Sequence, residues 1–263
     1  IPGTTPGGGS GGKMRVLITA GGTRAYIDEI RWLGNVSSGR FGAELAWAAL
    51  RQGASVLHFH SERAVSPVEK KINISAPLEP QWEEAQALAT AFAPHRSRYR
   101  ERTFLSLESY QEKLEEILRT EHFDVIFLAA AVSDYAPVAQ TGKIPSDREH
   151  LTIELDRVPK TIDRVKSWAP SIYQVGFKLL VGSSREELLA AAEKSALHNG
   201  SDCIVANDLV DLRESRHTIH LVRPGQPTET YQPESDPAER LVERVFHWAT
   251  ERQPAMASNG ARP

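Results

Sequence analysis

The stretch Leu17-Ile18-Thr19-Ala20-Gly21-Gly22-Thr23, followed by Asn35-Val36-Ser37-Ser38-Gly39-Arg40-Phe41-Gly42, decides the fold of this chain. The first segment has the pattern of a buried strand that runs into a glycine turn, and the second that of a Ser/Gly-rich entrance to a helix. Such an arrangement aims backbone N–H groups at phosphate groups. Neither the GxGxxG spacing of a dinucleotide fold nor the GxxxxGK[ST] of a P-loop occurs. The stretch therefore predicts a nucleotide site that is Rossmann-like in position and unusual in its motif.

The composition indicates one sizeable α/β domain, because 263 residues with 40% hydrophobic and 25% charged side chains can bury a core. A formal net charge of -3, from 31 Lys+Arg against 34 Asp+Glu, gives no electrostatic reason to expect nucleic acid or an anionic membrane. No apolar stretch approaches the roughly 20 residues that span a bilayer. The one cysteine, Cys203, lies in an apolar run, which indicates a core residue and a reducing compartment. We expect a cytoplasmic protein without nucleic-acid or membrane partners.

Glycine- and proline-rich ends predict a flexible leader at 1–13 and a disordered tail at 253–263, which leaves a single domain at 14–252. Within this domain we interpret 61–102 as an insertion that holds an extra helix at 79–92 and a solvated basic loop at 94–102. Residues 136–150 are rich in turn formers and predict a mobile flap.

Strands and helices alternate through the rest of the chain. The pattern predicts an open, doubly wound, mostly parallel Rossmann-like sheet with helices on both faces, ending in an antiparallel pair around 218–222. We expect a serine cap at Ser109 for the helix in the middle of the chain. The expected strands are 15–20, 55–59, 103–107, 125–132, 172–177 and 203–206, and the expected helices are 39–52, 109–120 and 185–198.

Ligands of such sheets bind outside the carboxyl ends of the strands, so the informative residues follow the apolar runs. Gly21 and Gly22 can adopt positive φ and allow close approach of a ligand, and Thr23 adds a hydroxyl, although an ordinary turn has the same composition. Asn35 offers an amide to a polar intermediate or a cap to a helix. Further polar residues follow later strands at Ser133-Asp134-Tyr135, Phe177-Lys178 and Asn207-Asp208. We expect these places to converge.

Other charged residues have a functional and a structural interpretation. Asp134 can accept a ribose hydroxyl, hold Mg2+ near phosphates, or cap a turn. Lys143 lies in the flap, where it can close over an anion or remain solvated. Lys194 and His198 lie one helical turn apart and form a possible cationic pair. No zinc spacing and no Ser or Cys nucleophile motif occurs in the sequence, which argues against covalent catalysis.

Several segments, taken together and in order, resemble the phosphopantothenate-cysteine ligases over about residues 14–247. These segments are Ile18-Thr19-Ala20-Gly21-Gly22-Thr23-Arg24, Ile27-Asp28-Glu29-Ile30-Arg31, Asn35-Val36-Ser37-Ser38-Gly39, Ala129-Ala130-Ala131-Val132-Ser133-Asp134-Tyr135, Lys143-Ile144, Val175-Gly176-Phe177-Lys178 and Ala206-Asn207-Asp208.

The resemblance implies a ligase that joins 4'-phosphopantothenate to L-cysteine in coenzyme A biosynthesis. The carboxylate is activated as an acyl-nucleotide with release of pyrophosphate, and cysteine then displaces the nucleotide. The co-substrate is CTP or ATP, with CTP slightly favoured, and Mg2+ arrives with the nucleotide instead of on dedicated protein ligands. The resemblance also implies a homodimer. No flavin-binding decarboxylase domain precedes the matched segments, so we expect the monofunctional form.

Carried over position by position, the resemblance assigns three catalytic residues. Asn35 matches the asparagine that steadies the acyl-nucleotide, Arg31 an active-site arginine nearby, and Lys143 the flap lysine that neutralises charge on the α-phosphate. Only one flap lysine is present, because Pro145 and Ser146 follow Lys143-Ile144. The implied nucleotide-binding residues are Gly21, Gly22, Thr23, Ser38, Gly39, Ala130, Asp134, Pro159, Lys160, Thr161, Ile162, Phe177, Lys194 and His198.

Two other classes of function stay open on the residues alone. A nicotinamide- or flavin-dependent oxidoreductase has the same sheet and an acidic residue after the second strand, where this chain has Glu62. A non-catalytic nucleotide-binding regulator is compatible with the single-lysine flap. Turnover of cysteine, or binding of NADPH, separates these classes from the ligase.

Overall fold

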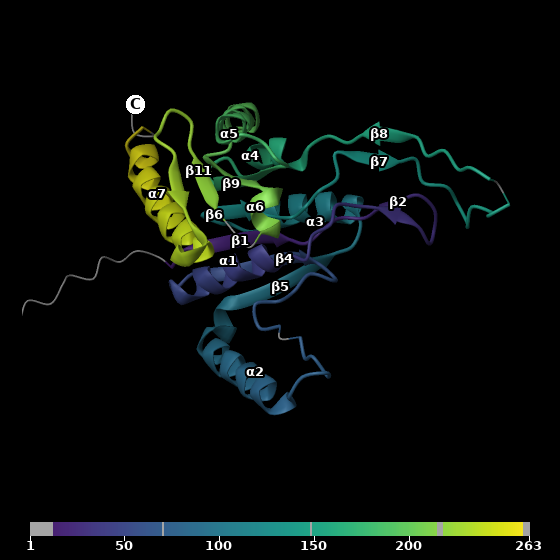
Figure 1. Ribbon diagram of the computed structural model, residues 1–263. Coiled ribbons are helices and arrows are strands. Elements are labelled where there is room, and N and C mark those ends of the chain that lie inside the picture. The colour runs from purple at the N-terminus through teal and green to yellow at the C-terminus, as the bar shows by residue number, and fades with distance from the viewer. Residues whose placement is uncertain (1–12, 70, 148, 215–217, 260–263) are drawn as a thin grey trace, which may run out of the picture.

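The computed structural model describes residues 13–69, 71–147, 149–214 and 218–259, without the side chains of 253–259. Its centre is an eight-stranded sheet (Figure 1). In spatial order the strands are β12 (Glu229–Tyr231), β11 (Ile219–Val222), β10 (Cys203–Asp208), β9 (Tyr173–Leu180), β6 (Val125–Leu128), β1 (Arg15–Ala20), β4 (Ser55–Ser61) and β5 (Tyr99–Phe104).

Six of these strands are parallel, and their order reverses beside β1. From β1 the chain adds β4 and then β5 on one side, and afterwards β6, β9 and β10 on the other. Val16 of β1 is in register with Val56 of β4 and with Val125 of β6. This is the strand order of the Rossmann fold, whose ligands bind at the point of reversal. The predicted fold class is confirmed, including the antiparallel addition of β11.

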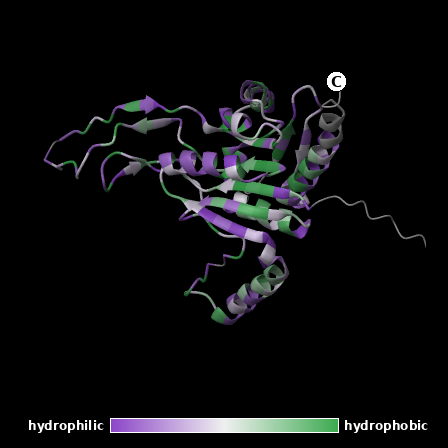
Figure 2. Ribbon diagram, turned by 180° about the vertical axis from the view of Figure 1, so that it is seen from behind, coloured by the Kyte–Doolittle hydropathy of each residue, from purple (hydrophilic) through white to green (hydrophobic). Residues whose placement is uncertain are grey.

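Helices cover both faces of the sheet because side chains along each strand alternate between them. Ile18 packs with α1 (Arg40–Arg51) and α7 (Pro237–Asn259) on one face, and Leu17 with α3 (Leu107–Thr120) and α4 (Val165–Trp168) on the other. The helix α5 (Arg185–Asn199) covers β10 on that second face. Figure 2 shows the central strands as hydrophobic and β5 at the edge as hydrophilic.

That hydrophilic edge strand corrects the prediction for this part of the chain. The expected strand at 103–107 was wrong, because β5 begins at Tyr99 inside the segment that we interpreted as a basic loop and an insertion. An edge strand tolerates charged side chains. The segment of β5 therefore has no apolar run by which its sequence could indicate a strand. Arg102 forms an ion pair with Glu116 of α3, and Arg100 with Glu121, the residue after α3.

Element ends also differ from the prediction. The cap of α3 is Ser106, whose hydroxyl accepts from Ser109 N at 3.1 Å, so the expected cap at Ser109 was wrong. The strand β6 stops at Leu128, whereas β9 and β10 extend beyond the expected 177 and 206. At the carboxyl end α7 continues to Asn259, so the tail expected from 253 is helical as far as the structure describes it. Residues 1–12 of the expected leader lie outside the described residues.

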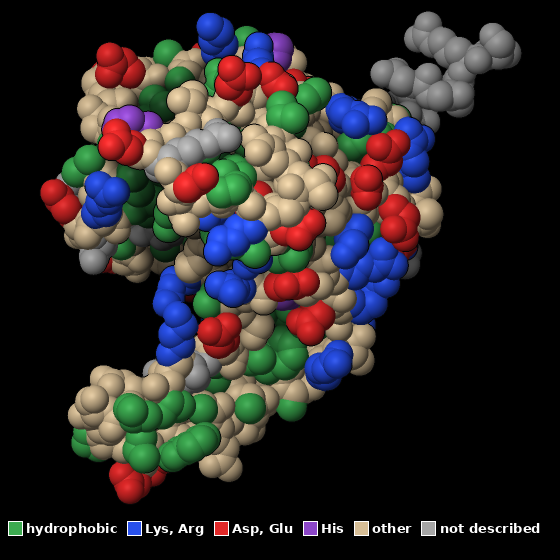
Figure 3. Space-filling model, turned by 90° about the vertical axis from the view of Figure 1, so that its right-hand side faces the viewer, with side chains coloured by type: hydrophobic (Ala, Val, Ile, Leu, Met, Phe, Trp, Pro, Cys, Tyr) green, Lys and Arg blue, Asp and Glu red, His purple; other side chains and the backbone are tan. Residues whose placement is uncertain are grey.

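Two parts of the chain project from the sheet. A lobe below β5 holds α2 (Leu78–Phe92), which confirms the predicted helix, and η1 (Ala93–Arg98). Of α2 only Phe92 is buried, where its ring stacks on Trp47. Apolar side chains gather on this lobe (Figure 3). The exposed apolar residues of this segment include Ile74, Leu78 and Trp82.

The second projection is an arm of two hairpins at the carboxyl edge of the sheet (Figure 1). They pair β2 (Ala25–Tyr26) with β3 (Trp32–Leu33) and β7 (Tyr135–Pro137) with β8 (Leu155–Arg157). The expected flap, 136–150, belongs to this arm, and its mobility stays a prediction. The short elements that complete the fold are η2 (Thr161–Asp163), α6 (Leu209–Arg213) and η3 (Pro233–Ser235). Across the described ranges, no helix combines the length and apolarity needed to cross a bilayer.

Candidate active site

The glycine turn after β1 lies at the point where the strand order reverses. Gly21 has φ 81°, and its carbonyl accepts from Ala131 N at 2.7 Å, so the turn is bound to the segment that follows β6. Gly22 continues this pairing with Ala131. The Thr23 side chain is 1% exposed and its hydroxyl accepts from Ser133 N at 3.4 Å. The two glycines thus lie at the expected ligand edge, whereas the Thr23 hydroxyl is occupied inside the protein.

The entrance of α1 lies directly against this turn. Gly39, with φ 75°, is the N-cap residue, and a Cβ built on it would come within 3.2 Å of Gly21 N. The hydroxyls of Ser37 and Ser38 accept from the amides of Gly39 and Arg40, each at 3.3 Å, so they bond locally. The first turn of α1 has no acidic residue. A helix amino terminus of this kind presents a positive dipole end and N–H groups to an anion.

Of the three residues expected to be catalytic, Arg31 and Lys143 belong to one bonded part of the arm, and Asn35 is bound to the segment after β6. Asn35 donates from Nδ2 to Val132 O at 3.2 Å, which ties it to the segment after β6. Arg31 forms an ion pair with Asp28 and donates to Ile144 O at 3.3 Å. Ile144 N in turn donates to Asp28 Oδ2 at 3.1 Å. The flap residue Lys143, exposed and next to Ile144 in the chain, is therefore held on the same arm as Arg31.

Asp28 is the residue that our reasoning from sequence did not assign. Its burial alone would raise the carboxyl pKa, but hydrogen bonds from the amides of Ile30, Ile144 and Arg31 and from the Arg31 side chain lower the pKa to about 2. Asp28 is consequently ionised in the neutral range and holds two segments that lie far apart in the chain. The sequence feature that could have indicated this role is an aspartate that precedes an arginine by three residues in a turn.

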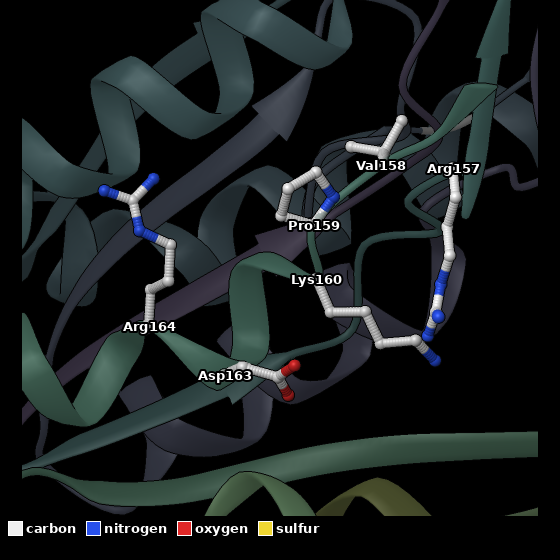
Figure 4. A pocket seen from close by; sticks show the side chains of 6 residues that line it. All are labelled: Arg157, Val158, Pro159, Lys160, Asp163 and Arg164. Atoms are coloured by element: carbon white, nitrogen blue, oxygen red, sulfur yellow. The ribbon is translucent and has the colours of Figure 1, made fainter.

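Two of the predicted residues, Pro159 and Lys160, help to line a pocket in the segment between β6 and β9. Asp134 pairs with Lys160 (Oδ1 to Nζ, 3.4 Å), and Val158 N donates to Asp134 O at 2.9 Å. The pocket holds about 290 Å3, and Figure 4 shows that Arg157 and Lys160 extend to one side while Arg164 points away. His198 of α5 adjoins it through Asp163 (Nε2 to Oδ2, 3.7 Å). The lining residues are Arg157, Val158, Pro159, Lys160, Asp163 and Arg164.

Not every member of the predicted nucleotide set has its side chain at this pocket. Thr161 is 5% exposed, and its hydroxyl has no hydrogen-bond partner among the described residues. Ile162 packs against the core cluster around α3. The turn thus directs Pro159 and Lys160 to the pocket and the next two side chains inward, because a 3-10 helix begins at Thr161. Lys194 is exposed on α5.

The remaining predicted positions lie within a strand or just after one. Phe177 lies within β9 and not after it, with its ring edge-on to Phe41 of α1 at 6.0 Å. Ala130 is half-buried, and its amide donates to Thr19 Oγ1 at 3.2 Å. Asp208 is the last residue of β10, where amides of Gly182, Ser183 and Val210 bond its carboxylate, lowering its pKa to about 2. The Asp208 carboxylate therefore connects the loop after β9 with the start of α6.

The groups at this edge are cationic side chains and backbone N–H groups, which suit an anionic ligand. Burial raises the pKa of the Cys203 thiol to about 12, as befits the core residue we expected. Across the residues that the structure describes, no three His, Cys, Asp or Glu side chains are grouped to hold a metal ion. Cationic side chains, a helix amino terminus and a glycine turn instead surround the point where the strand order reverses.

The strand order and this edge define a Rossmann-like α/β protein whose ligand site lies at the reversal beside β1. The model of one family, described as DNA/pantothenate metabolism flavoprotein C-terminal domain, matches residues 12–79 and 86–248, so the chain belongs to that family.

Relatives agree with this membership. A coenzyme A biosynthesis bifunctional protein CoaBC of Thermococcus kodakarensis is 35% identical over 79% of this chain and 44% of its own length. A phosphopantothenate--cysteine ligase of Mus musculus is 29% identical over 89% of this chain and 84% of its own. These names confirm the resemblance inferred from the motifs. The chain spans about half the length, 44% and 50%, of the bifunctional relatives from Thermococcus and Methanocaldococcus jannaschii.

Solved structures show the same fold. The DNA/pantothenate metabolism flavoprotein of Streptococcus pneumoniae superposes with a TM-score of 0.71 at 27% identity, covering 89% of this chain and 99% of that one. The Cab2 H337A variant in complex with phosphopantothenate-cysteine superposes with a TM-score of 0.80 at 22% identity, covering 93% of this chain and 89% of that one. At that identity the second likeness establishes the fold alone.

Proposed function

We propose that this protein is a phosphopantothenate-cysteine ligase. It activates the carboxylate of 4'-phosphopantothenate with a nucleoside triphosphate, releases pyrophosphate, and passes the acyl group to L-cysteine. The observations that carry the proposal are the hydrogen bond that joins Arg31 to Ile144, beside Lys143, and the bond that ties Asn35 to the segment after β6, four residues before the N-cap of α1. The Mus musculus relative described above is, by its name, a phosphopantothenate--cysteine ligase.

The cationic edge suits the electrostatic problem of the first step. Two anions, the substrate carboxylate and the α-phosphate, must meet, and charge then develops on the departing pyrophosphate. The amino terminus of α1, Arg31 and Lys143 offset this repulsion, and they do so more in the transition state than in the ground state. Asn35 offers an amide to the acyl-nucleotide that results.

The nucleotide extends from this edge toward the Lys160 pocket in our proposal. Lys160 and Arg157 supply positive charge there, and Asp134 offers a carboxylate to the ribose or to Mg2+ that accompanies the phosphates. Bound Mg2+ supplies further charge neutralisation. CTP is the nucleotide that we propose first, with ATP as the alternative.

The homodimer that the family resemblance implied remains a proposal, and the arm supports it. Apolar side chains are exposed along both hairpins, and such a surface is typical of an interface. Light scattering of the purified chain tests the proposal, and a monomer at micromolar concentration would contradict it. The exposed residues are Ile30, Trp32, Val36, Tyr135, Val138, Leu151, Ile153 and Leu155.

The central test measures pyrophosphate release with phosphopantothenate and either CTP or ATP, with and without cysteine. We expect Lys143→Gln to slow formation of the acyl-nucleotide roughly 100-fold, by analogy with loss of one transition-state donor. Asn35→Asp should still form the acyl-nucleotide but compromise its transfer to cysteine. Exposed Lys71→Gln, on the α2 side of the molecule, is the matched control.

Two outcomes would contradict the proposal. Near-wild-type release by Lys143→Gln would remove the role of that lysine. No cysteine-dependent product with either nucleotide would remove the ligase assignment and favour a nucleotide-binding regulator.

A further inference from the structure

A second hollow, of about 260 Å3, lies at the carboxyl ends of β1, β4 and β5. The Lys160 pocket is formed by residues between β6 and β9, so the two cavities lie on opposite sides of the strand reversal. The wall of the hollow includes Gly22, Asn35 and Ser37 on the side of the candidate active site. Asn35 thus borders both the proposed acyl-nucleotide and this hollow.

The opposite wall carries free charges of both signs. Glu62 and Arg63 follow β4, line the hollow and are exposed, and within the described part of the chain neither forms an ion pair. The Arg24 guanidinium lies 4.9 Å from the centroid of the Trp32 ring, and both residues also line the hollow. Leu105 adds an apolar side chain to the lining.

This set of groups matches a small zwitterion. A carboxylate such as that of Glu62 pairs with an α-ammonium group, and a guanidinium pairs bidentately with an α-carboxylate. A short thiol side chain fits against an aromatic ring, because sulfur makes favourable contacts with ring edges. An extended dinucleotide would need the glycine spacing that the turn after β1 lacks.

We propose that this hollow is the amino-acid subsite of the ligase, with Glu62 holding the α-ammonium and Arg63 the α-carboxylate of L-cysteine. The inference rests on the proposed function. The position beside Asn35 lets the amine reach the acyl carbon from the side opposite to the nucleotide pocket.

Glu62 also has a chemical role in this arrangement. The α-ammonium must lose a proton before its nitrogen can attack, and the Glu62 carboxylate accepts that proton. The amine lone pair then forms a C–N bond to the acyl carbon while the C–O bond to the α-phosphate breaks. The electron pair leaves with the nucleoside monophosphate, and a second proton passes from the nitrogen to solvent. Charge and atoms balance without a further reactant.

The test separates the two half-reactions in Glu62→Gln and Arg63→Gln, with Glu69→Gln as a control in the same segment but outside the hollow. Both variants should raise the KM for cysteine roughly tenfold or more, as loss of a charged hydrogen bond predicts. Pyrophosphate release in single turnover without cysteine should stay within about twofold of the wild type. Glu62→Gln should also lower kcat. The kcat of this variant should recover at higher pH, because more of the cysteine is then present as the free amine.

Distinct results would overturn this inference and the proposed function. If the wild type makes product and neither variant changes the KM for cysteine, the hollow is not the subsite. An equal loss in the cysteine-independent half-reaction would give these residues a structural role. Tight NADPH binding that Glu62→Gln abolishes would make the hollow a ribose site. A wild type without cysteine-dependent product would instead remove the ligase assignment itself.

Discussion

At the scale of single residues, the ligand edge depends on positions where a side chain has no room. Gly21 and Gly39 both have positive φ and face each other where the turn after β1 meets the entrance of α1. A Cβ on Gly39 would lie 2.5 Å from the Ala64 Cβ, and one on Gly21 would lie 2.1 Å from Ser61 Oγ. Both positions therefore favour glycine, because their φ is positive and a Cβ would overlap Ser61 or Ala64 at the end of β4.

Replacement of Gly39 by alanine should destabilise the protein more than the same change at Gly53. Gly53 has φ 90° but no atom within 4 Å of an added Cβ, so Gly53→Ala should cost only the left-handed strain, about 1 to 2 kcal/mol. Gly39→Ala adds overlap with Ala64, worth roughly another 1 to 3 kcal/mol. Urea unfolding of the two variants measures the difference. Equal losses would show that the entrance of α1 adjusts without cost.

At the scale of elements, the arm is braced by one carboxylate. Asp28 bonds the turn between β2 and β3 to Ile144, more than a hundred residues away in the chain. Because the folded pKa of Asp28 is about 2, below the ordinary 3.8, this bracing is fully present above pH 4. It is lost only as the pH falls toward 2.

Asp28→Asn should loosen the flap at neutral pH. An amide cannot offer two charged acceptor oxygens to Arg31 and to the amide of Ile144, so that amide should exchange with deuterium faster than in the wild type. If the proposed function holds, pyrophosphate release should fall as well. Asp156→Asn, at an exposed position of β8, is the matched control. Unchanged exchange at Ile144 would contradict the bracing.

At the scale of the whole molecule, a buried imidazole links stability to pH. His58 Nδ1 lies 3.1 Å from the Tyr99 hydroxyl, and its Nε2 has no partner among the described residues. Burial, together with the neighbouring His60 ring at 4.6 Å, lowers the pKa of His58 to about 3. Since the unfolded chain binds the proton first, stability is complete above the ordinary 6.5 and falls as the pH decreases toward 3.

The free energy of unfolding should be about 2 kcal/mol lower at pH 5 than at pH 7 on account of His58. Denaturant titrations at the two pH values measure this difference. His58→Phe removes the titration and should flatten the pH dependence by about that amount. The same slope in the variant would assign the effect to other groups.

The sequence alone determined the parts of this protein that rest on local patterns. Buried strands such as β1 and helices such as α1 repeat their apolar residues at a fixed spacing, and their order along the chain leads to the Rossmann-like sheet. The motifs around Gly21, Asn35 and Lys143 indicated the family. Residue types and their order along the chain can be compared without knowing which residues are in contact.

Only the tertiary structure decided what depends on contacts between distant segments. The polar edge strand β5 is a strand because β4 pairs with it, Asp28 matters because Ile144 reaches it, and Thr161 turns inward because a helical turn begins there. The hollow beside Glu62 forms where segments after β1, β4 and β5 meet. Such contacts leave no periodic pattern in the sequence, since hydrogen bonds and packing between remote residues are set by how the elements assemble.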